Sequence, residues 1–143
     1  MNTTNIKLPT IGKCRIRKAG TDLTVITYGN CVHHCLEAAM DLEEQDGLFA
    51  EVLDLRSLNP LDEEGILASV QKTNRVLIVH EDKVFAGFGG ELAAIIAQKA
   101  FTHLDAPIKR IGSTYTPVGF NRILERATLP NTKNVLEGMR EVI

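Results

Sequence analysis

The sequence has no tryptophan, only three cysteines and few aromatic residues, which make up 5% of its 143 residues. This scarcity of aromatic side chains leaves no stacking platform for nucleic-acid bases. The net charge is −2 and no block of basic residues occurs, which also argues against a nucleic-acid partner. An odd number of cysteines argues against a disulfide framework and is typical of a reducing cytosol. No apolar run approaches the roughly 18 residues that cross a bilayer.

What is present is the composition of one globular domain. The chain is 44% hydrophobic and 24% charged, which is ordinary for a folded protein. A chain of roughly 150 residues buries about two-thirds of its unfolded surface, so a substantial core can form. Residues 1–12 are mostly polar and are predicted to be a linker or an artificial start. Residues 13–143 are predicted to form the domain.

Short apolar runs alternate with helical patterns along the chain. We predict strands at residues 13–19, 23–28, 49–55, 75–80 and 108–111, and helices at 31–45, 63–72, 91–105, 123–126 and 132–143. Such alternation predicts an α/β fold, a three-layer αβα sandwich with a mostly parallel five-stranded sheet. The first strand is expected to be an antiparallel edge strand beside the second, because their connection is short. Asn30 and Asp62 are predicted helix caps, and Gly47 a helix end.

The centre of the predicted fold is the stretch from residue 75 to residue 101, which runs from a buried strand through a glycine-rich loop into a helix. The loop, residues 87–90, could be a nucleotide cradle or a tight joint between strand and helix. Leu92 occupies the position where a dinucleotide fingerprint requires glycine or alanine. Glu91 would repel a phosphate at the start of the helix. These two residues favour the tight joint.

The polar residues His80, Glu81 and Asp82 directly follow the central strand. Catalytic groups often lie at this edge of a parallel sheet, and histidine is a natural proton shuttle near neutral pH. The alternative is a solvated loop or an ion pair with a nearby arginine. No nucleophile is evident beside these residues, and the sequence does not choose between the alternatives.

Three further groups of residues have both a functional and a structural interpretation. Cys31, His34 and Cys35 share two helical turns, but zinc would need a fourth ligand, which favours buried free thiols. Arg56 and Asn59 lie at the same sheet edge as His80, or Arg56 pairs locally with Asp54. The last group forms either a contact surface or a cover for the last strand, and consists of Tyr115, Phe120, Arg122 and Arg126.

A set of motifs in fixed order carries a family resemblance. They occupy residues 25–29, 32–33, 36–39, 52–62, 79–81, 87–91, 105–110 and 129–130. In this order they resemble the C-terminal domain of transketolase-type enzymes, and most closely the beta subunit of the thiamine-diphosphate-dependent decarboxylating component of 2-oxo acid (pyruvate or branched-chain) dehydrogenase complexes. The resemblance covers residues 12–143. The chain begins where that domain begins, so we expect it to be a piece of a longer protein.

The resemblance implies an assembly role. In this family thiamine diphosphate and magnesium lie between two other domains, so no catalytic, cofactor-binding or metal-binding residue is expected here. The full enzyme would decarboxylate a 2-oxo acid and transfer the acyl group to lipoyl-lysine, while this domain alone would be inactive. Its expected compartment is the cytoplasm, or the mitochondrial matrix in a eukaryote. The alternative is a free-standing αβα module that binds an anionic ligand or a protein.

Two candidate contact sites follow from the resemblance. A subunit interface, including a homodimer contact, is expected at Arg56, His80, Glu81, Gly87, Gly89, Gly90 and Glu91. The dihydrolipoyl acyltransferase core component is expected to dock near Asp105 and the terminal carboxylate of Ile143. The chain departs from the family pattern at Phe85, where many members have a smaller, glycine-containing segment, and at residues 115–122.

Overall fold

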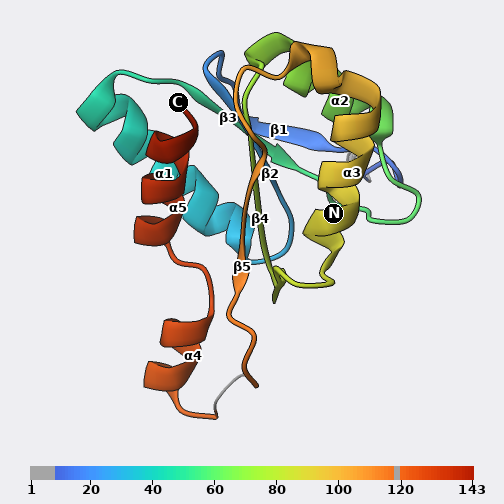
Figure 1. Ribbon diagram of the computed structural model, residues 1–143. Helices are drawn as coiled ribbons and strands as arrows, with labels where there is room; N and C mark the ends of the chain where they lie inside the picture. The colour runs from blue at the N-terminus through green and yellow to red at the C-terminus, as the bar shows by residue number, and fades with distance from the viewer. Residues whose placement is uncertain (1–8, 118–119) are drawn as a thin grey trace, which may run out of the picture.

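Five strands form a single mixed sheet at the centre of the protein (Figure 1). The computed structural model describes residues 9–117 and 120–143, so most of the predicted linker lies outside the described residues. The strand order is β1-β3-β2-β4-β5. The strands are β1 (Arg15–Lys18), β2 (Leu23–Thr27), β3 (Ala50–Asp54), β4 (Val76–Lys83) and β5 (Lys109–Ser113).

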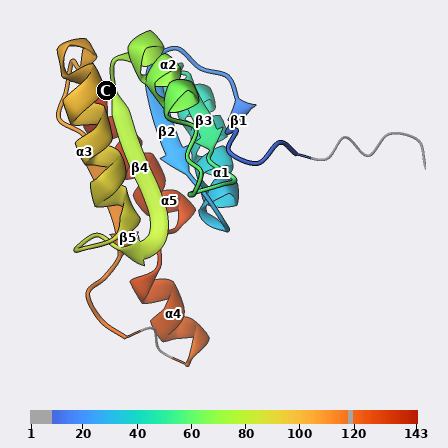
Figure 2. The ribbon, with the colours of Figure 1, turned by 90° about the vertical axis from the view of Figure 1, so that its right-hand side faces the viewer.

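Helices cover both faces of this sheet. They are α1 (Cys31–Asp46), α2 (Glu63–Thr73), α3 (Phe88–Ala100), α4 (Arg122–Thr128) and α5 (Thr132–Val142), with a 3-10 turn at Phe101–His103. One core cluster lies under α1 and α5, and a second lies under α2 and α3 (Figures 1 and 2). The predicted three-layer αβα sandwich is therefore confirmed. None of the helices within the described ranges combines the length and apolar character that a membrane span requires.

The predicted pairing of the first two strands is wrong. Strand β1 is antiparallel to β3, whereas β2 lies between β3 and β4 and is parallel to both. All five residues of β2 are buried, which suits a central strand, while three of the four in β1 are exposed. Gly20 makes the crossing possible, because a Cβ there would lie 2.3–2.5 Å from the backbone of residues 49–51.

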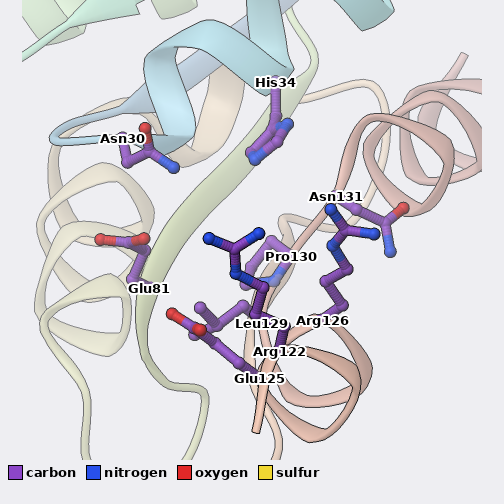
Figure 3. Close-up of a pocket in the computed structure, with 9 residues that line it drawn as sticks. All are labelled: Asn30, His34, Glu81, Arg122, Glu125, Arg126, Leu129, Pro130 and Asn131. Carbon is purple, nitrogen blue, oxygen red and sulfur yellow. The ribbon is translucent and has the colours of Figure 1, made fainter.

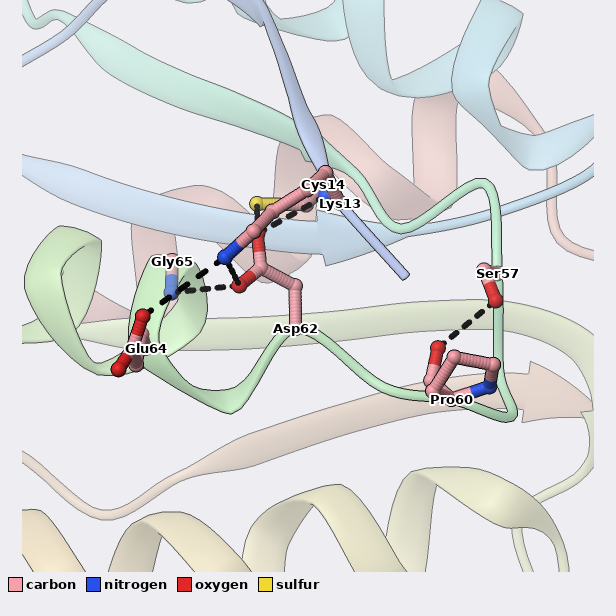
Figure 4. Close-up of polar contacts among 7 residues, drawn as sticks. All are labelled: Lys13, Cys14, Ser57, Pro60, Asp62, Glu64 and Gly65. Carbon is pink, nitrogen blue, oxygen red and sulfur yellow. Dashed lines mark hydrogen bonds and ion pairs between the residues drawn. The ribbon is translucent and has the colours of Figure 1, made fainter. Parts of the chain in front are cut away.

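Asp62 begins α2 as predicted and also ties the helix to the segment before β1 (Figure 4). Its carboxylate accepts hydrogen bonds from the Gly65 N–H at 3.3 Å, from the Cys14 N–H at 3.0 Å and from the Cys14 thiol at 3.2 Å. Lys13 Nζ lies 3.0 Å from the same carboxylate. Burial raises the pKa of Asp62, but these hydrogen bonds outweigh it and lower the pKa to about 2.

The other two predicted helix ends differ in outcome. Gly47 ends α1 in the left-handed conformation, with φ at 68°, and its N–H donates to Glu43 O at 3.1 Å, which confirms the prediction. The predicted cap at Asn30 is wrong, because the residue has helical φ and ψ and its side chain makes no capping bond within the described chain. The Asn30 side chain instead lines a surface cavity.

Candidate functional site

The central strand β4 extends further than the sequence predicts. The prediction ends it at His80 and places Glu81 and Asp82 in a loop, but β4 continues to Lys83, which is paired with Ser113 of β5. Pairing with the neighbouring strand therefore overrides the local polarity of the segment. His80 is fully buried, whereas Glu81 and Asp82 are exposed.

The imidazole of His80 joins the end of β4 to the start of α3. The Gly89 N–H donates to Nε2 at 3.1 Å, and Nδ1 lies 3.0 Å from the carbonyl oxygen of Asp82. A carbonyl oxygen only accepts, so these partners assign the proton to Nδ1 and leave Nε2 as the acceptor. The ring of Tyr28 stacks on the imidazole, with ring centroids 6.1 Å apart. His80 is therefore held as a neutral structural group.

The glycine-rich segment is the tight joint that the sequence favours. A Cβ at Gly87 would lie 1.9 Å from Lys83 O, and one at Gly89 would lie 2.1 Å from His80 Nε2. These close approaches let α3 begin at Phe88, three residues before the predicted start at Glu91. Since the Gly89 N–H already donates to His80, this amide is not free to bind a phosphate.

The seven residues of the expected subunit interface lie near the carboxyl ends of the parallel strands, but only three are exposed. Arg56, Glu81 and Glu91 face solvent, while the other four are partly or fully buried in the joint. The Arg56 N–H donates to the Asp54 carboxylate at 3.2 Å, whereas the carboxylate's ion-pair partner is Arg17, at 3.8 Å. The local pairing of Asp54 with Arg56 therefore runs through the backbone.

A group of exposed apolar side chains lies at the same edge. Helix α4 projects away from the body of the domain (Figures 1 and 2), and every residue in it except Thr128 is exposed. Phe85 and Tyr115 make an edge-to-face contact with each other, with ring centroids 5.5 Å apart. We call this group the apolar rim; it consists of Phe85, Tyr115, Phe120, Ile123 and Leu124.

Part of this rim was visible in the sequence. The sequence places Tyr115 and Phe120 in either a contact surface or a cover for the last strand, and assigns Ile123 and Leu124 only to a short helix. Their only signal is two adjacent apolar residues in a seven-residue helix, a pair that can face either the core or another chain. Ile123 is 76% exposed.

A cavity of about 470 Å³ separates α4 from the start of α1 and the end of β4 (Figure 3). Arg122 points into it between Glu81 and His34, whereas Arg126 points toward Asn131 (Figure 3). Glu125 also lines the cavity, so two arginines face two glutamates. This balance of charge suits a protein surface of mixed charge better than a small anion.

The cysteines of α1 are buried free thiols, as the sequence favours. Burial raises the pKa of Cys31 and of Cys35 to about 12, which keeps both protonated at neutral pH. His34 Nδ1 lies 3.2 Å from Thr132 Oγ1 rather than beside a thiol. Within the described residues no three His, Cys, Asp or Glu side chains are placed to hold a metal ion.

Comparison with known proteins identifies the family. Residues 12–135 match the family model described as transketolase, C-terminal domain. The chain belongs to this family. It is 44% identical over 133 residues to the pyruvate dehydrogenase E1 component subunit beta of Bacillus subtilis, and 43% identical to that organism's 2-oxoisovalerate dehydrogenase subunit beta. The two alignments include 93% and 92% of this chain, respectively, but only 40% of the length of each relative.

A solved structure supports the same fold. A split-gene transketolase, described as an inactive beta4 tetramer, superposes with a TM-score of 0.79 at 26% identity, over 93% of this chain and 42% of that one. The acetoin:2,6-dichlorophenolindophenol oxidoreductase subunit beta of Bacillus subtilis is 43% identical over 93% of this chain and 39% of its own. This transketolase C-terminal domain thus spans about 40% of the length of the relatives it matches.

The expected docking residues of this transketolase C-terminal domain lie at the opposite edge of the sheet. Asp105 is exposed just before β5, in a groove of about 490 Å³ whose other lining residues include Ala97 and Phe101. The C-terminus at Ile143 also lies near the amino ends of the parallel strands (Figures 1 and 2). The Ile143 side chain is half-buried against the core under α1 and α5.

Proposed function

We propose that this transketolase C-terminal domain is the assembly domain of a thiamine-diphosphate-dependent 2-oxo acid dehydrogenase. The whole enzyme decarboxylates a 2-oxo acid and transfers the acyl group to lipoyl-lysine, and this domain supplies subunit contacts. The observation that carries the proposal is the apolar rim, of which Ile123 and Leu124 lie on the projecting helix α4. Such exposed apolar area is costly in water and marks a surface that another chain or domain covers. The relatives named above are beta subunits, which fits this role.

The cofactor is expected outside this domain. Thiamine diphosphate with magnesium would need free backbone amides or basic side chains for its pyrophosphate, and oxygen ligands for the metal. The glycine-rich strand-to-helix joint at residues 87–90 does not fit, since the Gly89 N–H already donates to His80 and Glu91 lies in the first turn of α3. Titration calorimetry on the 143-residue chain should show no binding of thiamine diphosphate with magnesium. Micromolar binding would contradict the assignment.

The rim is tested in the whole enzyme by removing its apolar side chains. A double variant, Ile123→Ser with Leu124→Ser, leaves the domain core intact because both residues are exposed. Covering each side chain at an interface is worth about 1.5–3 kcal/mol, so the double variant should weaken association by about a hundredfold or more. Analytical ultracentrifugation should then show dissociated subunits at concentrations where the parent enzyme is assembled.

The charged part of the interface is tested by Glu91→Arg. This change reverses an exposed charge beside the joint, and the variant should assemble poorly. Glu44→Arg is the matched control. Glu44 is also exposed, near the C-terminal end of α1, and the substitution makes the same change in charge. If both variants purify as normal, active complexes, Glu91 is not part of the contact.

A second contact concerns the acyltransferase core component. Asp105 supplies a carboxylate to an otherwise apolar groove, and the terminal carboxylate of Ile143 lies at the same edge. We expect these two carboxylates to meet a basic segment of the partner, because the groove itself offers apolar contact and negative charge. Docking of the assembled enzyme should weaken with salt and with Asp105→Asn. Docking that is insensitive to salt would count against this contact.

A further inference from the structure

We propose that His80 is an acid-sensitive latch: when its imidazole takes up a second proton, the first turn of α3 and the loop 84–87 are released from β4. The inference concerns the joint itself and stands apart from the proposed function. Three elements meet around the imidazole of His80 in this joint. They are β4, the start of α3 and β5.

The hydrogen bonds around the ring exist only for neutral His80. Nδ1–H donates to Asp82 O at 3.0 Å and Nε2 accepts from the Gly89 N–H at 3.1 Å. A doubly protonated imidazole has two donors and no acceptor. The Nε2–H would then face the Gly89 N–H, so one hydrogen bond is lost and two donors meet in a buried space. The positive end of the α3 dipole at the same place adds to the repulsion.

The ring has no room to turn away from this conflict. A Cβ at Gly89 would lie 2.1 Å from His80 Nε2, and a Cβ at Gly112 would lie 3.0 Å from His80 Cε1. The backbones of α3 and β5 therefore contact the imidazole closely. The ring of Tyr28 covers one face, and Phe88 packs edge-to-face on Tyr28. Relief therefore comes from movement of the α3 turn rather than from rotation of the ring.

The charged groups around His80 do not cancel the conflict. Burial, the largest effect, lowers the pKa of His80, and Arg110 on β5 lowers it further. The hydrogen bond to Asp82 O and the charge of the Asp82 carboxylate raise it, without reversing the direction. Tyr28, directly after β2, faces the ring and is itself held neutral, since burial raises its pKa.

The loop that the latch holds is already strained. Ala86 has a φ of 59°, in the left-handed region that a non-glycine residue rarely occupies. The loop is tied down at Val84, whose carbonyl oxygen accepts from Arg110 Nη1 at 2.9 Å. Phe85 of the apolar rim lies in this loop. If the rim serves assembly, as proposed above, acid would also weaken assembly, but that consequence rests on the proposed function.

The closed joint binds the neutral form of His80, and this determines how its stability depends on pH. The opened joint exposes His80 with an ordinary pKa of 6.5, while the closed joint lowers that pKa. The closed state is therefore fully stable above pH 6.5 and loses stability as the pH falls toward the lowered pKa. Over that range the equilibrium constant for opening rises by up to tenfold per pH unit.

The test is nuclear magnetic resonance on the 143-residue chain from pH 7.5 to 5.0. The ratio of intrinsic to observed amide exchange at Gly89 should fall by up to tenfold per pH unit below pH 6.5, and it should stay well below the ratio at Val25 in β2, whose amide exchanges only when the whole domain unfolds. The imidazole nitrogen shifts of His80 should report the Nδ1–H tautomer at pH 7.5. Constant protection of Gly89 down to pH 5.0 would overturn the proposal.

The control variant is His80→Gln, whose side-chain amide offers both an acceptor and a donor but does not titrate. Its Gly89 amide should show protection that is independent of pH between 7.5 and 5.0. An equal loss of protection in this variant would assign the effect to another group. If the variant does not fold, the imidazole shifts of the parent chain decide: a doubly protonated His80 with Gly89 still protected contradicts the latch.

Discussion

Replacing Asp62 by asparagine isolates the contribution of one carboxylate charge to the fold. The substitution keeps the shape of the side chain and a capping oxygen for α2, but removes the charge. Asp62 is only 7% exposed and receives hydrogen bonds from Gly65 and from both the N–H and the thiol of Cys14. Lowering its pKa from 3.8 to about 2 corresponds to about 2 kcal/mol, at roughly 1.4 kcal/mol per pH unit.

The sign of the pH dependence is fixed by that direction. Because the folded protein has the lower pKa, the contribution of Asp62 is complete above pH 3.8 and is lost as the pH falls toward 2. The parent chain should therefore be about 2 kcal/mol more stable than Asp62→Asn at pH 7, with the difference closing near pH 2. In thermal unfolding this corresponds to about 4–8 °C for a domain of this size.

Urea unfolding at pH 7, 5, 3 and 2 measures this difference directly. Glu64→Gln is the matched control, because Glu64 lies on the same helix, 3.7 Å from the same Lys13, but is 93% exposed. Its substitution should change the free energy of unfolding little. A loss below about 0.5 kcal/mol for Asp62→Asn, the size of an ordinary surface effect, or a loss that does not vary with pH, would refute the reasoning.

Two further predictions concern the core and the strand crossing. At pH 8 a disulfide reagent should react with Cys31 and Cys35 far more slowly in the folded chain than in urea, because burial raises the pKa of both thiols to about 12; equal rates would contradict their burial. Gly20→Ala should cost about 1–3 kcal/mol, since its Cβ meets the backbone of residues 49–51. Gly47→Ala, which meets only open space, should cost about 1 kcal/mol. If calorimetry finds Gly20→Ala the milder change, the crossing geometry is wrong.

The candidate site was predictable in part. The side chains of Arg122 and Arg126 were assigned to a possible contact surface from their place after the last strand, and both line the cavity beside α4. That Ile123 and Leu124 join them on a projecting helix was not predictable, because an apolar pair in a short helix can pack inward or face outward. The burial of His80 was missed for a similar reason: polar neighbours in sequence suggested solvent, while β5 and α3 surround the ring in space.

By itself the sequence determined the local elements and, through their alternation, the layered fold. The β-branched run in β4, the cap at Asp62 and the left-handed Gly47 act over a few residues, so their signals can be read directly. Only the tertiary structure decided the strand order and the environment of His80. Both depend on which segments, distant in sequence, approach closely enough to pair, and no local pattern encodes that choice.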